Sequence, residues 1–248
     1  MTSLSSQLAF LITTLIVCTL WGRVLWFFAD YFRGFNSLVF HAMTFTRRSH
    51  GELKALFLGA IYYLFGLLAA FLLWAAFAFG QPIGFALSPM HVPLIVLGIV
   101  GQISLSNLLV SLYCELIPGR APAERLGELQ SIPWIRGVMD LPPRLAPTAA
   151  ALGGVVEEFF FRGVVLQVLV QQLRVPDFLA ITVAGALFLL QQLLQVQTLF
   201  QAVLIGAGCI AISLVGGALV ICTGSITPAL LCHASFVVFY LDRQRSAR

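Results

Sequence analysis

The chain has 248 residues, of which 60% are hydrophobic and only 10% are Asp, Glu, Lys or Arg. A soluble globular domain carries about 25% charged residues, and a disordered chain is poor in apolar residues, so this composition excludes both classes. The net charge of +4 does not indicate nucleic-acid binding, because Lys and Arg cluster in the joints between apolar runs. The composition predicts an all-α membrane protein, a polytopic bundle of transmembrane helices.

Apolar segments follow one another along the whole chain. No charged residue occurs from 55 to 114 or from 178 to 241. Because a helix needs about 20 residues to cross the hydrocarbon core, each of these stretches has room for two or three crossings. About seven transmembrane helices are predicted, at residues 6–29, 55–79, 92–116, 148–170, 178–196, 199–222 and 225–241.

The distribution of basic residues predicts an orientation with the N-terminus outside and the C-terminus in the cytoplasm. With the N-terminus outside, every basic joint and the tail face the cytoplasm, and Arg174 is the exception. This distribution agrees with the positive-inside rule. The basic residues predicted on the cytoplasmic side are Arg33, Arg47, Arg48, Lys54, Arg120, Arg125, Arg136, Arg144, Arg243, Arg245 and Arg248.

Three regions are predicted. Residues 1–147 hold N-terminal transmembrane helices and a Pro-rich cytoplasmic joint, 148–241 form a helical core, and 242–248 are a basic cytoplasmic tail. Within the joint, residues 124–139 mix charged and apolar side chains. They are interpreted as a short helix on the membrane surface or as a solvated loop.

Three charged residues, Glu157, Glu158 and Arg162, lie inside the otherwise apolar segment 148–170. Each charge in the middle of a membrane helix costs about 2.5–3.5 kcal/mol, which indicates a specific use. Glu158 and Arg162 are four residues apart, acid first, so an ion pair on one helix face is predicted. Glu157 lies about 100° further round the helix and is predicted to stand alone, where it suits proton transfer from water. Alternatively, all three only tie helices together by hydrogen bonds.

His233, inside the segment 225–241, is the candidate partner of Glu157. Glu157 is ten residues from Pro147, about 15 Å at 1.5 Å per residue. His233 is eight residues from Leu241, about 12 Å. Since both distances start from the predicted cytoplasmic face, the two side chains are expected at a similar depth and in a shared site.

Glutamines near these segments admit two interpretations. They could line a polar cavity that opens to the cytoplasm, or they could hydrogen-bond between helices. The glutamines are Gln167, Gln171, Gln172, Gln191, Gln192, Gln195, Gln197 and Gln201.

Three motifs occur in order: EExxxR at 157–162, then Phe188 with a polar residue four positions on, then GSITPALLCH at 224–233. Over residues 148–240 these motifs resemble the CPBP family, the CAAX-protease and bacteriocin-processing family, also called the ABI family. The resemblance implies an intramembrane protease that cleaves peptide bonds near or within the membrane.

By this resemblance, Glu157 activates the attacking water, Glu158 and Arg162 support it, and His233 is the histidine of the third motif. No cofactor is predicted, although the resemblance leaves a divalent metal open. The implied partners are a membrane-associated peptide or protein substrate and the lipid bilayer, without nucleic acid, and no oligomeric state is predicted. The bacterial cytoplasmic membrane is the expected location.

Two positions depart from the family pattern. Gln192 stands where the second motif has histidine, and Val237 stands where the third motif has asparagine or a similar residue. Gln192 can still donate a hydrogen bond to an oxyanion but cannot shuttle a proton, and Val237 can do neither. Two hypotheses follow: an endopeptidase with Glu157 as base and with His233 and Gln192 as hydrogen-bond donors, or a non-catalytic protein of the same fold that binds a membrane client.

Other protease mechanisms fit the sequence poorly. It has no HExxH motif for catalytic zinc, and an aspartyl dyad needs two buried Asp residues, whereas Asp177 and Asp242 lie at the ends of predicted spans. Ser235 is two residues from His233, so the two side chains point to different sides of a helix.

Overall fold

The computed structural model describes residues 4–78, 83–117 and 124–246, which form helices joined by short loops, with no strand among them. The predicted all-α class is therefore confirmed. Arg120 and Arg248, predicted on the cytoplasmic side, lie outside the described residues.

Each of the seven predicted apolar segments falls on a long helical stretch in the described part of the chain. In four of them, Leu4–Tyr31, His50–Phe77, His91–Leu116 and Leu199–Thr223, the helix is long and apolar enough to cross a membrane. The number of crossings and the orientation remain predictions. The long stretches are α1 (Leu4–Trp26, continued by the π-helical η1, Phe27–Tyr31), α3 (His50–Phe77), α4 (His91–Leu116), α7 (Ala146–Glu158, continued by η2, Phe159–Leu166, and η3, Val168–Gln172), α8 (Asp177–Leu193), α9 (Leu199–Thr223) and α10 (Thr227–Ser246).

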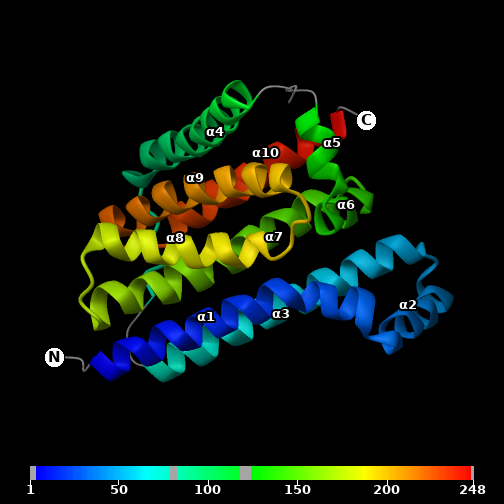
Figure 1. The fold of residues 1–248 in the computed structure, drawn as a ribbon, viewed down its shortest axis with the longest axis horizontal. Coiled ribbons are helices and arrows are strands. Elements are labelled where there is room, and N and C mark those ends of the chain that lie inside the picture. Colours follow the sequence, from blue (N-terminus) through cyan, green and yellow to red (C-terminus); the bar gives the residue numbers. More distant parts are fainter. Residues whose placement is uncertain (1–3, 79–82, 118–123, 247–248) are drawn as a thin grey trace.

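The long helices run roughly parallel or antiparallel to one another (Figure 1). α1 and α3 lie side by side at one edge of the bundle and α4 lies at the opposite edge, with α7 to α10 between them. α7 packs on α10, α8 on α9, and α4 on both α9 and α10. The two marked ends of the chain lie at opposite ends of the bundle (Figure 1).

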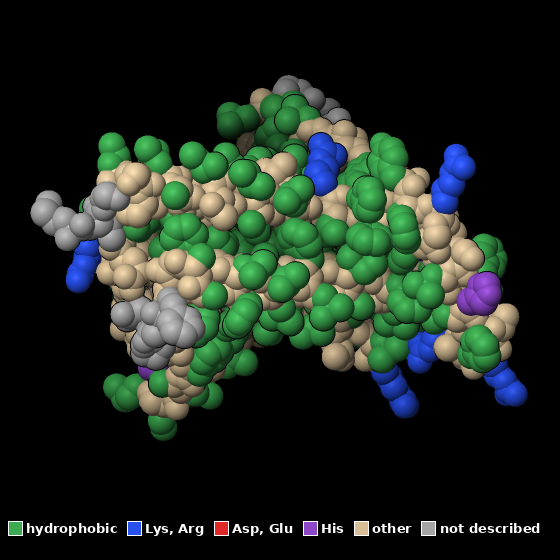
Figure 2. Space-filling view, turned by 90° about the horizontal axis from the view of Figure 1, so that it is seen from below, with side chains coloured by type: hydrophobic (Ala, Val, Ile, Leu, Met, Phe, Trp, Pro, Cys, Tyr) green, Lys and Arg blue, Asp and Glu red, His purple; other side chains and the backbone are tan. Residues whose placement is uncertain are grey.

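The surface agrees with an integral membrane protein. Hydrophobic side chains are spread over the whole face shown in Figure 2, and the Lys and Arg side chains project mainly toward its right-hand end. In Figure 1 that end carries α2 (Arg33–Thr46), α5 (Glu124–Ser131) and α6 (Pro133–Asp140). The predicted orientation assigns this end to the cytoplasm.

The short helices differ in part from the sequence prediction. α2 is not among the predicted elements, although it buries Phe35 and Val39 against α3. Residues 124–139 form two helices, α5 and α6, so the interpretation as a solvated loop is wrong. The break falls at Ile132, because Pro133 has no N–H to donate and therefore begins a new helix.

Candidate active site

The EExxxR motif lies at the junction of α7 and η2. Glu158 ends the α-helix, and the π-helical turns begin at the next residue. Arg162 Nη1 lies 3.2 Å from Glu158 Oε1, and both side chains are almost fully buried, so the predicted pair is present. Gly216 of α9 allows the close approach of that helix, since a Cβ atom there would lie 3.3 Å from Glu158 Oε2.

Glu157 lies beside this pair, and its two carboxylate oxygens face side chains other than Arg162. One of its oxygens, Oε1, accepts a hydrogen bond from the hydroxyl of Tyr62 at 2.5 Å and another from Gln192 Nε2 at 2.8 Å. The other oxygen, Oε2, lies 3.7 Å from His233 Nε2. Glu157 therefore has no guanidinium partner, as the sequence predicts. The expectation that it stands alone is wrong, because two neutral donors, Tyr62 and Gln192, hold Oε1.

The ring of His233 faces both glutamates. Its Nδ1 lies 3.0 Å from Glu158 Oε1. A carboxylate only accepts hydrogen bonds, so this contact assigns the ring hydrogen to Nδ1. In the neutral imidazole Nε2 is therefore an acceptor, and it is directed toward Glu157. The distance of 3.7 Å is too long for a direct hydrogen bond and suits a contact through one water.

Phe188 of the second motif packs between two of these groups. The guanidinium carbon of Arg162 lies 5.2 Å from the centre of its ring, within the range of a cation–π interaction. The ring of His233 also contacts Phe188, in an edge-on arrangement with ring centres 5.9 Å apart. An aromatic residue at this position therefore fixes the guanidinium and the imidazole relative to each other.

The third motif sets the start of α10, and hence the position of His233. Gly224 ends α9 with φ 66°, a left-handed conformation that favours glycine. The Ser225 hydroxyl accepts a hydrogen bond from the backbone N–H of Thr227 and donates one to the carbonyl of Ala86 at 2.7 Å. The motif therefore caps α10 and ties it to the segment before α4.

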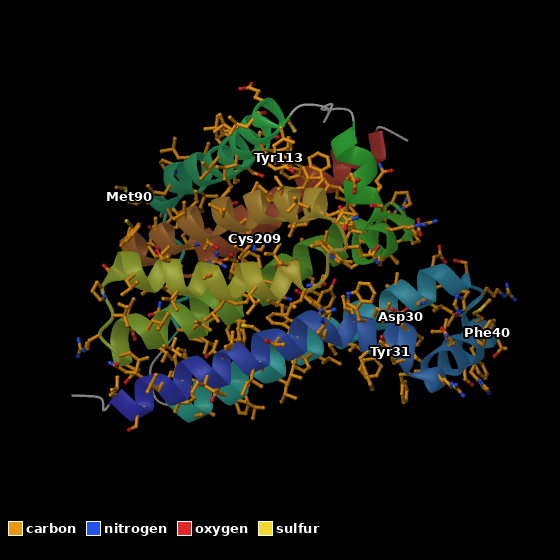
Figure 3. All side chains as sticks on the ribbon, viewed as in Figure 1. Asp30, Tyr31, Phe40, Met90, Tyr113 and Cys209 are labelled. Carbon is orange, nitrogen blue, oxygen red and sulfur yellow. The ribbon has the colours of Figure 1, made fainter. Side chains whose placement is uncertain are left out.

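A cavity of about 930 Å³ opens beside Glu157, Gln192 and His233. It extends along one face of α3, where its lining residues include Gly51, Lys54, Ala55, Leu58 and Tyr62. Its walls also include Cys209 and Asp30, which in Figure 3 lie in the middle of the bundle and near the junction of α1 with α2. The cavity therefore leads from the buried carboxylate toward the end of the bundle that carries α2.

The glutamines divide between the two interpretations. Gln192, Gln195 and Gln197 line the cavity. Gln191 donates to the Tyr62 hydroxyl, and Gln201 caps the start of α9. Gln167 and Gln171 bond to each other on an exposed surface, and Gln172 is not among the lining residues. The cavity interpretation is therefore wrong for the five glutamines that do not line the cavity, Gln167, Gln171, Gln172, Gln191 and Gln201.

The two departures from the family pattern both lie at the cavity. The amide of Gln192 donates a hydrogen bond to Glu157, so this N–H holds the carboxylate and does not face the position of an oxyanion. A primary amide has two N–H groups, and the second remains for the cavity. Val237, one helical turn after His233, contributes an apolar wall.

Neither Tyr62 nor the hydrogen bond that Gln191 donates to it is predicted from the sequence. Tyr62 lies in α3, 95 positions before Glu157, and nothing in the run of α3 distinguishes it from its neighbour Tyr63. The one available signal is that a phenol in an apolar span needs a hydrogen-bond partner when it is buried.

The residues of the site fit a metal poorly. Within residues 4–78, 83–117 and 124–246, no three His, Cys, Asp or Glu side chains are grouped so that they could hold a metal ion. Glu158 is already engaged by Arg162 and His233, which leaves Glu157 and the imidazole as donors. We therefore derive no step through a metal.

An apolar helical bundle with a buried Glu–Glu–Arg–His cluster at the inner end of a cavity defines an integral membrane protein with a candidate acid–base centre. Residues 141–239 match the family model described as type II CAAX prenyl endopeptidase Rce1-like. The resemblance predicted from the motifs is confirmed over that segment. No curated protein matched the chain in a search of such proteins, and a search of solved structures also found no match.

Proposed function

We propose that the protein is an intramembrane endopeptidase of the CAAX-processing type, which hydrolyses a peptide bond of a membrane-associated substrate with a water that Glu157 activates. The observation that carries the proposal is the free oxygen of Glu157, Oε2, which lies 3.7 Å from His233 Nε2 at the wall of the 930 Å³ cavity. Residues 148–241 form the catalytic-type core in this proposal, and 1–147 surround it.

In the reaction, a water lies between Glu157 Oε2 and His233 Nε2. The carboxylate takes one proton, and the water oxygen forms a bond to the carbonyl carbon, whose C=O electrons move to the carbonyl oxygen. The tetrahedral intermediate then collapses, the C–N bond breaks, and protonated Glu157 returns the proton to the departing amine. His233 accepts the second hydrogen bond of the water and so sets the direction of attack.

The pair of Glu158 and Arg162 supports this arrangement through the imidazole. With Nδ1–H bound to Glu158, the ring presents Nε2 to the cavity, as the orienting carboxylate does in a Ser–His–Asp triad. Arg162 lies 3.2 Å from the same Glu158 oxygen, so the guanidinium and the imidazole are both held by one carboxylate. The second N–H of Gln192 is the candidate donor to the carbonyl oxygen of the substrate.

The size and composition of the cavity support a peptide substrate that reaches the site from one end of the bundle. The cavity is in the range of ligand pockets, and its walls are mainly apolar with a few polar groups. We further propose that the protein acts in a bacterial cytoplasmic membrane, with the open end of the cavity on the cytoplasmic side. The cytoplasmic opening of the cavity follows from the predicted orientation.

The test is a Glu157→Gln variant of the purified protein in nanodiscs, assayed with a prenylated or otherwise membrane-anchored fluorogenic peptide. The glutamine can still accept from Tyr62 but cannot take a proton, so kcat should fall by at least about 10³-fold. Glu115→Gln, an exposed carboxylate outside the cavity, is the matched control and should keep wild-type turnover.

One result would replace this proposal with the non-catalytic alternative. Val237, which can neither donate nor accept a hydrogen bond, favours a protein that binds a client without cleaving it. If the wild-type protein binds anchored peptides but cleaves none, and Glu157→Gln binds them equally well, the protein is a membrane scaffold.

A further inference from the structure

We propose that Tyr62 is a positioning residue of the candidate active site: its hydroxyl fixes which oxygen of Glu157 faces the cavity. This inference rests on the proposed peptidase function. It adds a contribution from α3, which lies outside the segment 141–239 that matches the protease family.

The hydrogen bonds of the Tyr62 hydroxyl can have only one direction. Its single hydrogen points to Glu157 Oε1, since a carboxylate cannot donate, at an oxygen–oxygen distance of 2.5 Å. Its oxygen accepts from Gln191 Nε2 at 2.8 Å. The amide of Gln191 therefore holds the hydroxyl in the rotamer that donates to the carboxylate.

The ring of Tyr62 is held as firmly as its hydroxyl. Tyr62 is 7% exposed and packs against Trp21 with ring centres 5.0 Å apart. The indole N–H of Trp21 also donates to the backbone carbonyl of Tyr62 at 3.1 Å. Trp21 in turn packs against Phe160 and Phe161, which lie two and three positions after Glu158. α1, α3 and η2 therefore form one rigid support behind the carboxylate.

This support makes the two oxygens of Glu157 unequal. Tyr62 and Gln192 both donate to Oε1, which leaves Oε2 to face His233 across 3.7 Å. A carboxylate with one oxygen held twice keeps the other oriented for proton transfer. Without the hydroxyl, a single amide holds Glu157, and the carboxylate can rotate about its terminal bond.

The first test compares Tyr62→Phe with Tyr63→Phe in the nanodisc peptidase assay. Tyr62→Phe should lower kcat by about 10- to 100-fold, the usual range for loss of a hydrogen bond to a charged group, while KM stays within about two-fold. Tyr63→Phe is the matched control. Its phenol donates to the carbonyl of Ala149 and not to Glu157, so kcat should change by less than about three-fold.

The second test is a double-mutant cycle with Gln191→Leu, which removes the donor to Tyr62 but keeps the volume. Gln191→Leu alone should lower kcat by about 3- to 10-fold, and it should have no further effect in a Tyr62→Phe background, because both changes act through one hydrogen-bond chain. A structural role would instead give additive losses of folded protein and of melting temperature.

The outcomes separate this inference from the proposed function. A wild type without turnover ends the peptidase proposal and this inference with it. An active wild type with an unchanged Tyr62→Phe variant overturns the positioning role alone. Equal losses in Tyr62→Phe and Tyr63→Phe, or additive effects in the cycle, also overturn it.

Discussion

The N-terminal helices and the C-terminal core differ in how much of their surface is buried inside the bundle. In the most apolar stretch of α9, 67% of the residues are buried, against 33% for the stretch that includes α1, 28% for α3 and 22% for α4. Helices α1, α3 and α4 therefore present most of their side chains outward, and α9 lies inside. The charged cluster is in the inner region, on α7, η2 and α10.

This difference shows what a charge inside a membrane protein requires. Glu158 and Arg162 are tolerated because α9, α10 and Phe188 exclude lipid and supply the partners. The outer helices can remain almost entirely apolar and still contribute to the site, as Tyr62 does from α3. The comparison predicts that equivalent substitutions in the two regions have unequal effects.

The largest expected effect is that of Glu158→Gln. The change leaves the guanidinium of Arg162 buried without an anion, and breaking a buried pair in this way costs about 3–5 kcal/mol of unfolding free energy. Glu52→Gln in α3 is the same substitution in the outer region. Glu52 caps the backbone N–H of Ser49, which glutamine also does, so stability should hardly change. Thermal unfolding in detergent and the yield of folded protein measure both. Equal melting temperatures for the two variants would contradict the comparison.

A smaller effect is expected where the two regions meet, at Gly66 of α3. A Cβ atom there would overlap the Trp21 ring and lie 2.7 Å from Val156 of α7, so Gly66→Ala pushes Trp21 and Val156 away from α3. Overpacking of this kind costs about 1–3 kcal/mol.

Gly59→Ala is the control for this position. The nearest atoms to a Cβ atom at Gly59 belong to Tyr63, at an ordinary 3.6 Å, so no loss of stability is expected. Thermal unfolding of both variants checks the prediction. A Gly66→Ala protein as stable as Gly59→Ala would mean that α1, α3 and α7 are not tightly packed at this level.

The smallest effect is expected for Ser225→Ala, which removes the cap of α10 and the hydrogen bond to Ala86. Loss of a helix cap costs about 0.5–2 kcal/mol. Thr19→Ala removes an exposed hydroxyl that bonds only within its own helix and should be nearly neutral. Chemical denaturation in mixed micelles can resolve the difference, and a Ser225→Ala protein with wild-type stability would refute the assigned role of the third motif.

The fold class could be predicted from the sequence because hydrophobic segment length is a local property. Charge-free runs predict spans, and each predicted span falls on a helix. The short α2 was not predicted because it is held by the packing of Phe35 and Val39 on α3. A local sequence pattern does not predict such a contact between segments. The break between α5 and α6 could have been read from Pro133, which begins α6.

The grouping of Glu157 with His233 was accessible to sequence reasoning because both depths could be counted from the ends of their own spans. The detailed hydrogen bonding was not accessible in this way. The rotation of α3 and α8 about their axes relative to α7 decides which oxygen of Glu157 is held and by which side chain. The hydropathy of the sequence does not predict this rotation.

By itself, then, the sequence determined that the chain is a helical membrane protein and which charged side chains must be sheltered from lipid, since desolvation of a charge is costly wherever the helix packs. The tertiary structure alone decided that a tyrosine from α3 approaches a carboxylate 95 positions away and that Gln192 holds this carboxylate. Hydrogen bonds need their atoms within about 3 Å, and only the packed bundle sets distances of that size.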